Sequence, residues 1–506
     1  MAFLMPGTAA RRLPILLKTA ASSSPSRLVI ARQCLPLVGP LNPGARLGVS
    51  AAVFQAQQST RVAGLDAARM QMRMFSHATR AFQAASPSYA TSSSSASSTG
   101  SSSSSSSSSF PEKTTSKAVA VWLIGSAISV FGIVVWGGLT RLTESGLSIT
   151  EWRPVTGSMP PRDEAEWESE FAKYKASPEY AILNPNMSLA EFKKIYFMEW
   201  SHRLWGRAVG MTFVLPALYF VARRRVSKPM AFNLLGISAL IGFQGVIGWW
   251  MVKSGLKDDL FAPGSHPRVS QYRLTAHLGT AFVCYSWMLF SALTVLRTRR
   301  LVADPTAAMA LARTLSSPAL TRFRTLTTAL TALIFTTAMS GALVAGLDAG
   351  LIYNEFPMMG LGLAPPASEL WNPFYCRKAD QSDLWWRNML ENPSLVQLDH
   401  RILAMTTFTS VLALFVYSRR GKLAAALPKN VKKGALGLVH LVTLQAALGI
   451  TTLLYMVPTH VAATHQAGAL ALLTGALVLC HRLRIPKSTV RMLEKKIAEV
   501  SKTASR

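Results

Sequence analysis

Eight apolar runs constrain this chain more than any other feature of its sequence. They cover residues 118–138, 197–222, 232–252, 272–296, 323–345, 396–417, 434–457 and 461–480. Each is close to the 20 residues or so that an α-helix needs to cross a hydrocarbon layer of roughly 30 Å. A mean hydropathy of +0.26 with only 15% charged residues is too apolar for an ordinary soluble protein. We therefore predict an all-α integral membrane protein with eight transmembrane helices.

Basic residues cluster at every second junction between these runs, at residues 113–117, 223–228, 297–324, 419–433 and 482–487. By the positive-inside rule these junctions face one compartment, and both termini lie with them. The long connections 139–196 and 346–395 then lie on the other side. The net charge of +29 does not indicate nucleic acid, because no basic segment is interleaved with aromatic residues. Within the first connection, the acidic stretch 163–180 predicts a helix that Pro178 ends.

The N-terminal region predicts the organelle. Residues 1–75 are rich in arginine, with Asp66 as their only acid, which is typical of a mitochondrial transit peptide. We expect cleavage just after Arg73-Met74-Phe75, and a Ser-rich disordered tether over 76–117. The basic junctions and both termini then lie in the matrix, and the protein is a multi-pass protein of the inner mitochondrial membrane. The four cysteines form no close pair, so neither a thiolate metal site nor a disulfide framework is indicated.

The eight runs form two sets of four. Trp136-Gly137-Gly138 is echoed by Ser340-Gly341, and the stretch from Gln244 to Gly248 is echoed by the stretch from Gln445 to Gly449. Parallel repeats with an even number of crossings predict a pseudo-twofold axis along the membrane normal. We therefore expect two four-helix bundles, at 118–300 and 322–483, joined by a matrix linker at 301–321 and followed by a basic matrix tail at 484–506.

Histidines fall at matched depths in alternate runs: His202, His277, His400 and His465. A single membrane histidine is usually a hydrogen-bonded packing residue, but two per repeat, facing each other in a bundle, are what bis-histidine haem ligation requires. The pattern therefore predicts haem iron bound by these four side chains. The remaining histidines of the mature chain lack repeat partners, and among them we expect only His460 to lie near a site.

The two predicted sites differ in one acid. Glu199 stands three residues before His202, whereas Gln397 stands three before His400. A carboxylate can accept a proton and an amide cannot, so the first half is interpreted as reactive and the second as a fixed cofactor site. The alternative for Glu199 is an ion pair with Arg203 or Arg207. Arg203 and Arg401 are candidate contacts to haem propionates; the alternative for both is contact with lipid headgroups.

Several longer strings closely resemble the haem A synthase family of mitochondrial cytochrome oxidase assembly proteins. They run from Thr143 to Ile149, from Trp152 to Val155, from Met159 to Pro161, from Glu191 to Arg203, and from Tyr353 to Met358. The resemblance extends from about residue 119 to about 482. It implies an oxidoreductase that converts the methyl group at porphyrin position 8 of haem O to a formyl group, giving haem A.

The resemblance also implies roles for the candidate residues. It assigns haem O, the substrate, to His202 and His277, haem b to His400 and His465, and the family's essential acid to Glu199. Ferredoxin and its reductase are the implied electron partners on the matrix side, and haem O synthase, cytochrome oxidase assembly factors and further copies of the chain are candidate partners. One bacterial branch has a cysteine pair in its first outer loop, but residues 139–196 contain none.

Two other classes of function use the same histidines. A dihaem b-type cytochrome that only transfers electrons needs four ligands but gives no reason for Glu199 in one half alone. A transporter with a histidine proton relay also suits parallel repeats. For the enzyme, two histidine ligands leave the iron no open position for dioxygen. Either one ligand leaves during turnover, or water supplies the oxygen and iron only accepts electrons.

Overall fold

The computed structural model describes residues 114–261 and 266–504. The transit peptide, its cleavage site and nearly all of the Ser-rich tether lie outside these residues, so those predictions stay as they are. No β-strand occurs in the two described ranges, which contain only an isolated bridge between Met359 and Gly362.

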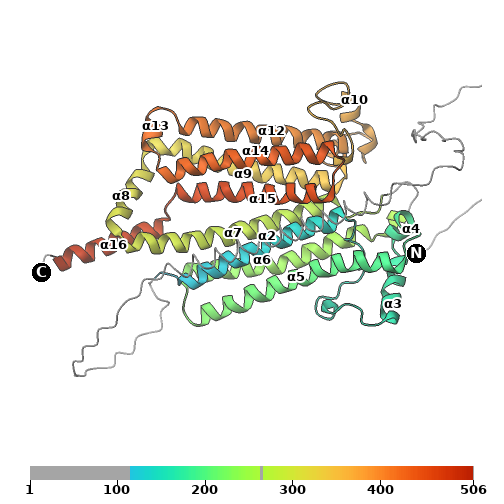
Figure 1. Cartoon of the computed structure of the whole chain (residues 1–506), viewed down its shortest axis with the longest axis horizontal. Helices are drawn as coiled ribbons and strands as arrows, with labels where there is room; N and C mark the ends of the chain where they lie inside the picture. The colour runs from blue at the N-terminus through green and yellow to red at the C-terminus, as the bar shows by residue number, and fades with distance from the viewer. Residues whose placement is uncertain (1–113, 262–265, 505–506) are drawn as a thin grey trace, which may run out of the picture. The chain divides into compact units, whose positions relative to one another are not determined.

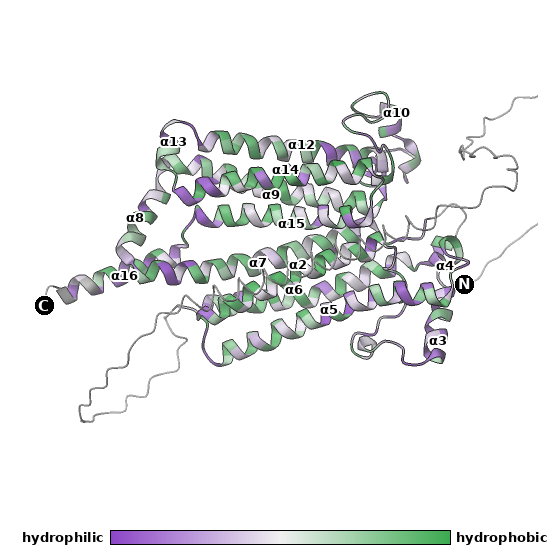
Figure 2. Ribbon diagram, in the orientation of Figure 1, coloured by the Kyte–Doolittle hydropathy of each residue, from purple (hydrophilic) through white to green (hydrophobic). Residues whose placement is uncertain are grey.

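Eight helices in the described part are long and apolar enough to cross a membrane, which confirms the predicted fold class (Figure 1). Figure 2 shows hydrophobic residues along their lengths and hydrophilic ones gathered toward their ends. The helices are α2 (Lys117–Leu142), α5 (Leu189–Ala222), α6 (Lys228–Gly255), α7 (Gln271–Ala303), α9 (Pro318–Gly346), α12 (Pro393–Ser418), α14 (Lys429–Leu454) and α15 (Thr459–Arg482).

Local sequence sets where these helices begin. At α5, Ser188 and Glu191 form a capping box, in which each side chain accepts a hydrogen bond from the other residue's backbone N–H. This cap lets α5 start about two turns before the apolar run at 197. At α12, Asn392 accepts from Ser394 N at 3.0 Å and Pro393 occupies the first helical position. Polar caps therefore extend the helices beyond the limits that hydropathy alone predicts.

The membrane helices pack as two rings. Helices α2, α5, α6 and α7 contact one another in a closed circuit, and so do α9, α12, α14 and α15. The rings also touch, because α2 packs on α15 and α7 packs on both α9 and α15 (Figure 1). We call the first ring the first half and the second ring the second half. The pseudo-twofold relation between them stays a prediction.

Burial separates the inner faces of these helices from their outer faces. Phe213, Met288 and Phe323 are fully buried in the shared core. By contrast, Phe232 and Leu235 on α6 leave 64% and 65% of their surface exposed. Large apolar side chains left open on a long helix are what contact with lipid requires.

Two short helices cover the first half at the end that carries connections 139–196 and 346–395, which we call the outer end. These are α3 (Glu164–Lys175) and α4 (Pro178–Leu183), with η1 (Thr156–Ser158) before them and η2 (Asp258–Phe261) packed against α4. The prediction that Pro178 ends the acidic helix was wrong. That helix ends at Lys175, and Pro178 instead begins α4 behind the N-cap Ser177, since proline at a first helical position needs no N–H partner.

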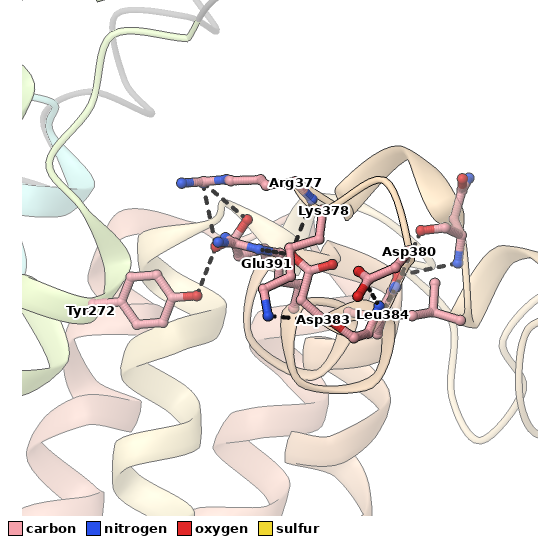
Figure 3. Close-up of polar contacts among 11 residues, drawn as sticks. Tyr272, Arg377, Lys378, Asp380, Asp383, Leu384 and Glu391 are labelled. Atoms are coloured by element: carbon pink, nitrogen blue, oxygen red, sulfur yellow. Dashed lines mark hydrogen bonds and ion pairs between the residues drawn. The ribbon is translucent and has the colours of Figure 1, made fainter.

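The outer connection of the second half is held by a polar network (Figure 3). Arg387 binds Asp383 at 2.7 Å and Glu391 at 2.6 Å, and the Tyr272 hydroxyl of α7 donates to Glu391 at 2.9 Å. The network therefore ties this connection to the first half. The connection contains η3 (Ala349–Leu351), α10 (Ala367–Leu370), η4 (Pro373–Tyr375) and α11 (Leu384–Glu391).

The opposite, basic end carries three further helices, α8 (Pro305–Ser316), α13 (Gly421–Ala426) and α16 (Lys487–Ala504). The expected linker 301–321 thus contains α8, and the expected basic tail forms α16. Leu493 of α16 is fully buried, in a cluster with Leu301 and Ala308. The tail therefore packs on the body of the protein.

Candidate functional site

The four predicted histidines line one continuous cavity. They come from alternate membrane helices of the two halves: His202 from α5, His277 from α7, His400 from α12 and His465 from α15. The cavity volume is about 1230 Å³, which exceeds the roughly 300–1,000 Å³ of a typical small-molecule pocket. The cavity therefore has room for more than one large ligand.

Each imidazole lies against a glycine of a neighbouring helix. A Cβ atom added to that glycine would stand 2.8 Å from the histidine Cε1 at Gly137 and at Gly449, 3.1 Å at Gly341 and 3.3 Å at Gly248. The first two separations are shorter than real Cβ contacts, so a larger residue there displaces the ring. The four pairs are His202 with Gly137, His277 with Gly248, His400 with Gly341, and His465 with Gly449.

In each half, one glutamine bonds to the backbone of the second histidine. Gln244 donates from Nε2 to the His277 carbonyl at 3.0 Å, and Gln445 donates to the His465 carbonyl at 2.9 Å. The sequence echo from Gln244 to Gly248 therefore has a geometric meaning, since its glutamine fixes the histidine backbone and its glycine accommodates the ring. Sequence patterns had marked these residues only as signs of a repeat.

The histidines differ at Nδ1. Ser340 lies 2.8 Å from the His400 Nδ1 and can hydrogen-bond to it. In the first half the corresponding position is Trp136, whose Nε1 donates to Ser201 at 2.9 Å. The Nδ1 atoms of His202, His277 and His465 are buried and have no hydrogen-bond partner among residues 114–261 and 266–504.

Glu199 is 3% exposed and lines the cavity with both oxygens engaged. Ser148 Oγ and Ile149 N donate to its Oε2 at 2.7 and 2.8 Å. Arg203 donates to its Oε1 through Nη2 at 2.6 Å and Nε at 3.0 Å. The ion pair considered from the sequence is therefore present, and the carboxylate is fixed in one orientation at the cavity wall.

Gln397 has the same place in the second half. Its Nε2 donates to the carbonyls of Ala349 and Ile352 at 2.8 and 2.6 Å, and its Oε1 accepts from Arg401 at 3.2 Å. Glu199 thus attaches α5 to connection 139–196, and Gln397 attaches α12 to connection 346–395. They differ in that Glu199 brings a negative charge and Gln397 does not.

The arginines that follow His202 and His400 hold the outer connections. Arg203 donates to the carbonyls of Glu151 and Ile149, and Arg401 donates to those of Met358 and Tyr353. Arg203 has three of its nitrogens in use, while the Arg401 Nε is buried without a partner within the described part of the chain. Contacts to propionates stay a prediction, and Arg401 retains a buried donor for one.

The cavity wall also contains an acid that sequence patterns did not indicate. Glu179 of α4 is 3% exposed, and its Oε2 is buried without a partner in the described ranges. Burial, and then the negative charges of Glu199 and Glu144, raise its pKa to about 8, while Arg141 opposes the shift. Nothing in the sequence around Glu179, which follows Ser177 and Pro178, predicts that its side chain is buried at a cavity wall.

The outer rim joins the halves. Asp348 in the second half binds Arg141 at 2.6 Å and Arg268 at 3.0 Å, both from the first half. Of the other histidines, His266 lines the cavity at this rim and His460 is not among its lining residues. A role for His460 stays a prediction, and His266 is the additional histidine that the cavity wall contains.

Comparison with known proteins identifies the family. The model of a family described as cytochrome oxidase assembly protein matches residues 120–477. The heme A synthase COX15 of Saccharomyces cerevisiae is 53% identical over 77% of this chain and 80% of its own length. The chain belongs to this family. The expectation drawn from the sequence strings is therefore confirmed.

Two further relatives extend the comparison. The heme A synthase of Nitrosospira multiformis is 41% identical over 74% of this chain and 97% of its own length. A heme A synthase-mitochondrial ferredoxin fusion protein of Schizosaccharomyces pombe is 50% identical over 74% of this chain and 61% of its own length. The matches to the yeast and bacterial relatives reach over most of those proteins, so the likeness involves the membrane body and not a single module.

Proposed function

We propose that this multi-pass membrane protein is a haem A synthase, which oxidises the C8 methyl group of haem O to a formyl group. The observation that carries the proposal is the cavity in which two histidine pairs each lie against glycines. The relatives named heme A synthase, at 41–53% identity, support the same reaction. A side chain at Gly137 or Gly449 would displace the adjoining imidazole, so these glycines let the histidines line the cavity.

The assignment of ligands follows the asymmetry of the halves. We assign the substrate, haem O, to His202 and His277, and resident haem b to His400 and His465. Haem b supplies a one-electron redox centre when bound. The Ser340 contact to the His400 Nδ1 supports a permanent site in the second half, because such a bond orients a metal-ligating histidine and raises its basicity.

Glu199 is our candidate proton acceptor. Turning a methyl group into a formyl group removes protons from carbon, and Glu199 stands at the cavity wall three residues before His202. Arg203 balances its charge, and Ser148 holds its Oε2 in place. Gln397 in the second half has no proton-accepting carboxylate, which supports a purely redox role there.

Partners and location follow from the relatives and from charge. The ferredoxin fused to the Schizosaccharomyces pombe relative supports a ferredoxin as electron partner. We place the chain in the inner mitochondrial membrane, with its basic end and both termini in the matrix and the histidine sites toward the intermembrane space. Ferredoxin reductase, haem O synthase and other assembly factors remain partners that the family resemblance implies.

Two alternatives have less support. A dihaem cytochrome would use all four histidines, but the relatives are named as synthases and Glu199 has no role in electron transfer alone. A proton-relaying transporter leaves the glycine contact of every imidazole without a reason.

The deciding experiment extracts and separates the haems of purified wild-type protein and of Glu199→Ala. We expect haem b, haem O, a hydroxylated intermediate and haem A from the wild type, and loss of the oxidised forms from the variant. Haem b alone in both proteins would instead establish the electron-transfer cytochrome.

The assignment of the halves needs a second pair of variants. His465→Ala should lose haem b and keep bound haem O, whereas His277→Ala should lose haem O and keep haem b. Normal haem b content in His465→Ala would contradict our assignment.

A further inference from the structure

One polar contact crosses between the halves at the level of the histidines. Gln466 of α15 donates from Nε2 to the backbone carbonyl of Val134 in α2, at 2.9 Å. A Cβ atom added to Gly138 would lie 1.7 Å from the Gln466 Oε1 and 2.6 Å from its Cδ. The amide of Gln466 therefore lies in a notch of α2 that exists because residue 138 has no side chain.

This contact connects the immediate neighbours of two candidate ligands. Gln466 follows His465 of the second half, and Gly138 follows Gly137, against which His202 of the first half packs. A displacement of α15 at Gln466 therefore moves the segment of α2 that supports the His202 ring. Because packed interiors are rigid, shifts well below 1 Å are felt at such contacts.

The link exists in one direction only. By the repeat, the residues that correspond to Gln466 and Gly138 are Leu278 and Ala342. Leu278 packs in the apolar core and Ala342 is 4% exposed. These two side chains have no polar atom, so they cannot reproduce the amide-to-carbonyl bond. The second half therefore donates a side-chain hydrogen bond to the first half at this level, and the first half has no amide at the corresponding position.

The polar character of Gln466 matters because the site is apolar. Val134 is 6% exposed, and a buried side-chain amide without its carbonyl partner destabilises the packed state, because it has given up its hydrogen bonds to water. A second contact crosses between the halves nearer the basic end, where the hydroxyl of Tyr285 in the first half lies 2.7 Å from the hydroxyl of Thr474 in the second. Of these two cross-links, the Gln466 bond is the one whose partners adjoin ligands in both halves.

We propose that Gln466 is a positioning residue that couples the two histidine sites by fixing the Gly137–Gly138 segment against His202 from the second half. The identity of the bound groups rests on the proposed function, but the contact itself does not. Gln466 lines the cavity beside His465 of its own half, and in our proposal it acts on the other half through α2. Its loss should therefore change the haem of the half to which Gln466 does not belong.

The experiment uses full-length protein purified with its haems, as wild type and as Gln466→Met, which keeps the side-chain length and removes the amide. The readouts are the electron paramagnetic resonance signal and the midpoint potential of each haem, assigned with His277→Ala and His465→Ala. We expect the first-half signal to shift and first-half haem retention to fall about tenfold, as for residues that orient metal ligands. The second-half signal and haem b content should remain.

Gln445→Met is the matched control. Gln445 is the same residue type in the same half and also bonds next to a ligand, but it donates to the His465 carbonyl within its own half. We expect this variant to alter the second-half signal first. The two glutamines of one half should therefore act on different haems.

Gly138→Ala tests the link from the opposite helix. Its new methyl group overlaps the Gln466 amide, while the sequence of α15 stays the same. The same first-half shift in this variant would support the link. An unchanged first-half signal in both variants, a change confined to the second half, or loss of both haems together would overturn it. A wild-type protein with a single haem signal would overturn the proposed function and the link with it.

Discussion

The two halves of the molecule share a framework and differ in chemistry. In both, each imidazole lies against a glycine, a glutamine bonds to the carbonyl of the last histidine, and a side chain three residues before the first histidine holds an outer connection. The differences are concentrated at Glu199 against Gln397 and at Trp136 against Ser340. On our proposed assignment, a few differences on one framework separate a reactive site from a site that retains its ligand.

The Nδ1 contact supports our proposal that the second half holds a resident ligand. The Ser340 hydroxyl fixes the orientation of His400, whereas the His202 ring has no such partner among the residues that the structure describes. A ligand held by an oriented imidazole leaves slowly, and a substrate must leave after oxidation. The comparison therefore predicts slow haem exchange in the second half and faster exchange in the first.

Alanine in the glycine notches should give the largest effects. Gly449→Ala places a Cβ 2.8 Å from the His465 Cε1, whereas Gly248→Ala places one 3.3 Å from the His277 Cε1. Overpacking of this kind costs about 1–3 kcal/mol, and we expect the upper end at Gly449, which weakens haem b binding about a hundredfold. Titration of haem into the two variants after their haems have been removed measures the affinity of each. If the two variants weakened haem binding equally, the effect would not come from the distance between the new Cβ atom and the imidazole.

Removal of the Nδ1 partner should have an intermediate effect. Ser340→Ala deletes one hydrogen bond of about 1 kcal/mol, so haem b should dissociate roughly fivefold faster. The first-half haem should be unaffected. Transfer of haem to apomyoglobin provides the rate, and Ser201→Ala, which removes a hydroxyl beside Trp136, serves as the control in the other half. An unchanged rate for haem b would remove our explanation of its retention.

The last prediction concerns pH and the first half alone. The pKa of Glu179 rises from 4.5 to about 8 in the folded protein, mainly through burial. Between these two values the folded state keeps a proton that the unfolded chain has lost, so stability falls as pH rises through this window. Glu179→Gln lacks this proton and should show a smaller decrease in Tm across the window.

The groups around Glu179 define the control for this measurement. Glu199 and Glu144 raise its pKa and Arg141 lowers it, while η2, packed against α4, carries the exposed residues Asp258 and Asp259. Asp258→Asn should therefore leave the decrease in Tm unchanged. A Glu179→Gln protein whose Tm depends on pH as steeply as the wild type would mean that Glu179 is ionised in the fold.

Much of the fold was predictable because membrane crossings depend on run length and charge at their ends, which the sequence shows directly. That the four histidines meet at one cavity was predictable from their repetition at matched depth, whereas their role as haem ligands stays a prediction. The start of α5 was not, because its cap at Ser188 lies beyond the apolar run. Pro178 was misassigned because proline both ends and begins helices, and only the neighbouring Ser177 cap distinguishes the two cases.

The site was less predictable than the fold, because its shape depends on approach distances. A glycine carries no chemistry in a sequence, so Gly137 and Gly449 indicated only a repeat. Glu179 and Gln466 depend on contacts between segments far apart in the chain, which no local pattern records. The distance in sequence between Gln466 and Val134 is 332 residues.

That separation has a consequence for biogenesis. A chain that enters its membrane N-terminus first inserts α2, α5, α6 and α7 as a group, and α15 arrives as the last of the eight membrane helices. Until then, the notch at Gly138 lacks the Gln466 amide that fills it in the folded protein, and the wall behind His202 is incomplete. The first half is therefore complete only after the last helix of the second half has been inserted. A chain truncated before α15 should fail at both sites, although only one of them has lost a histidine.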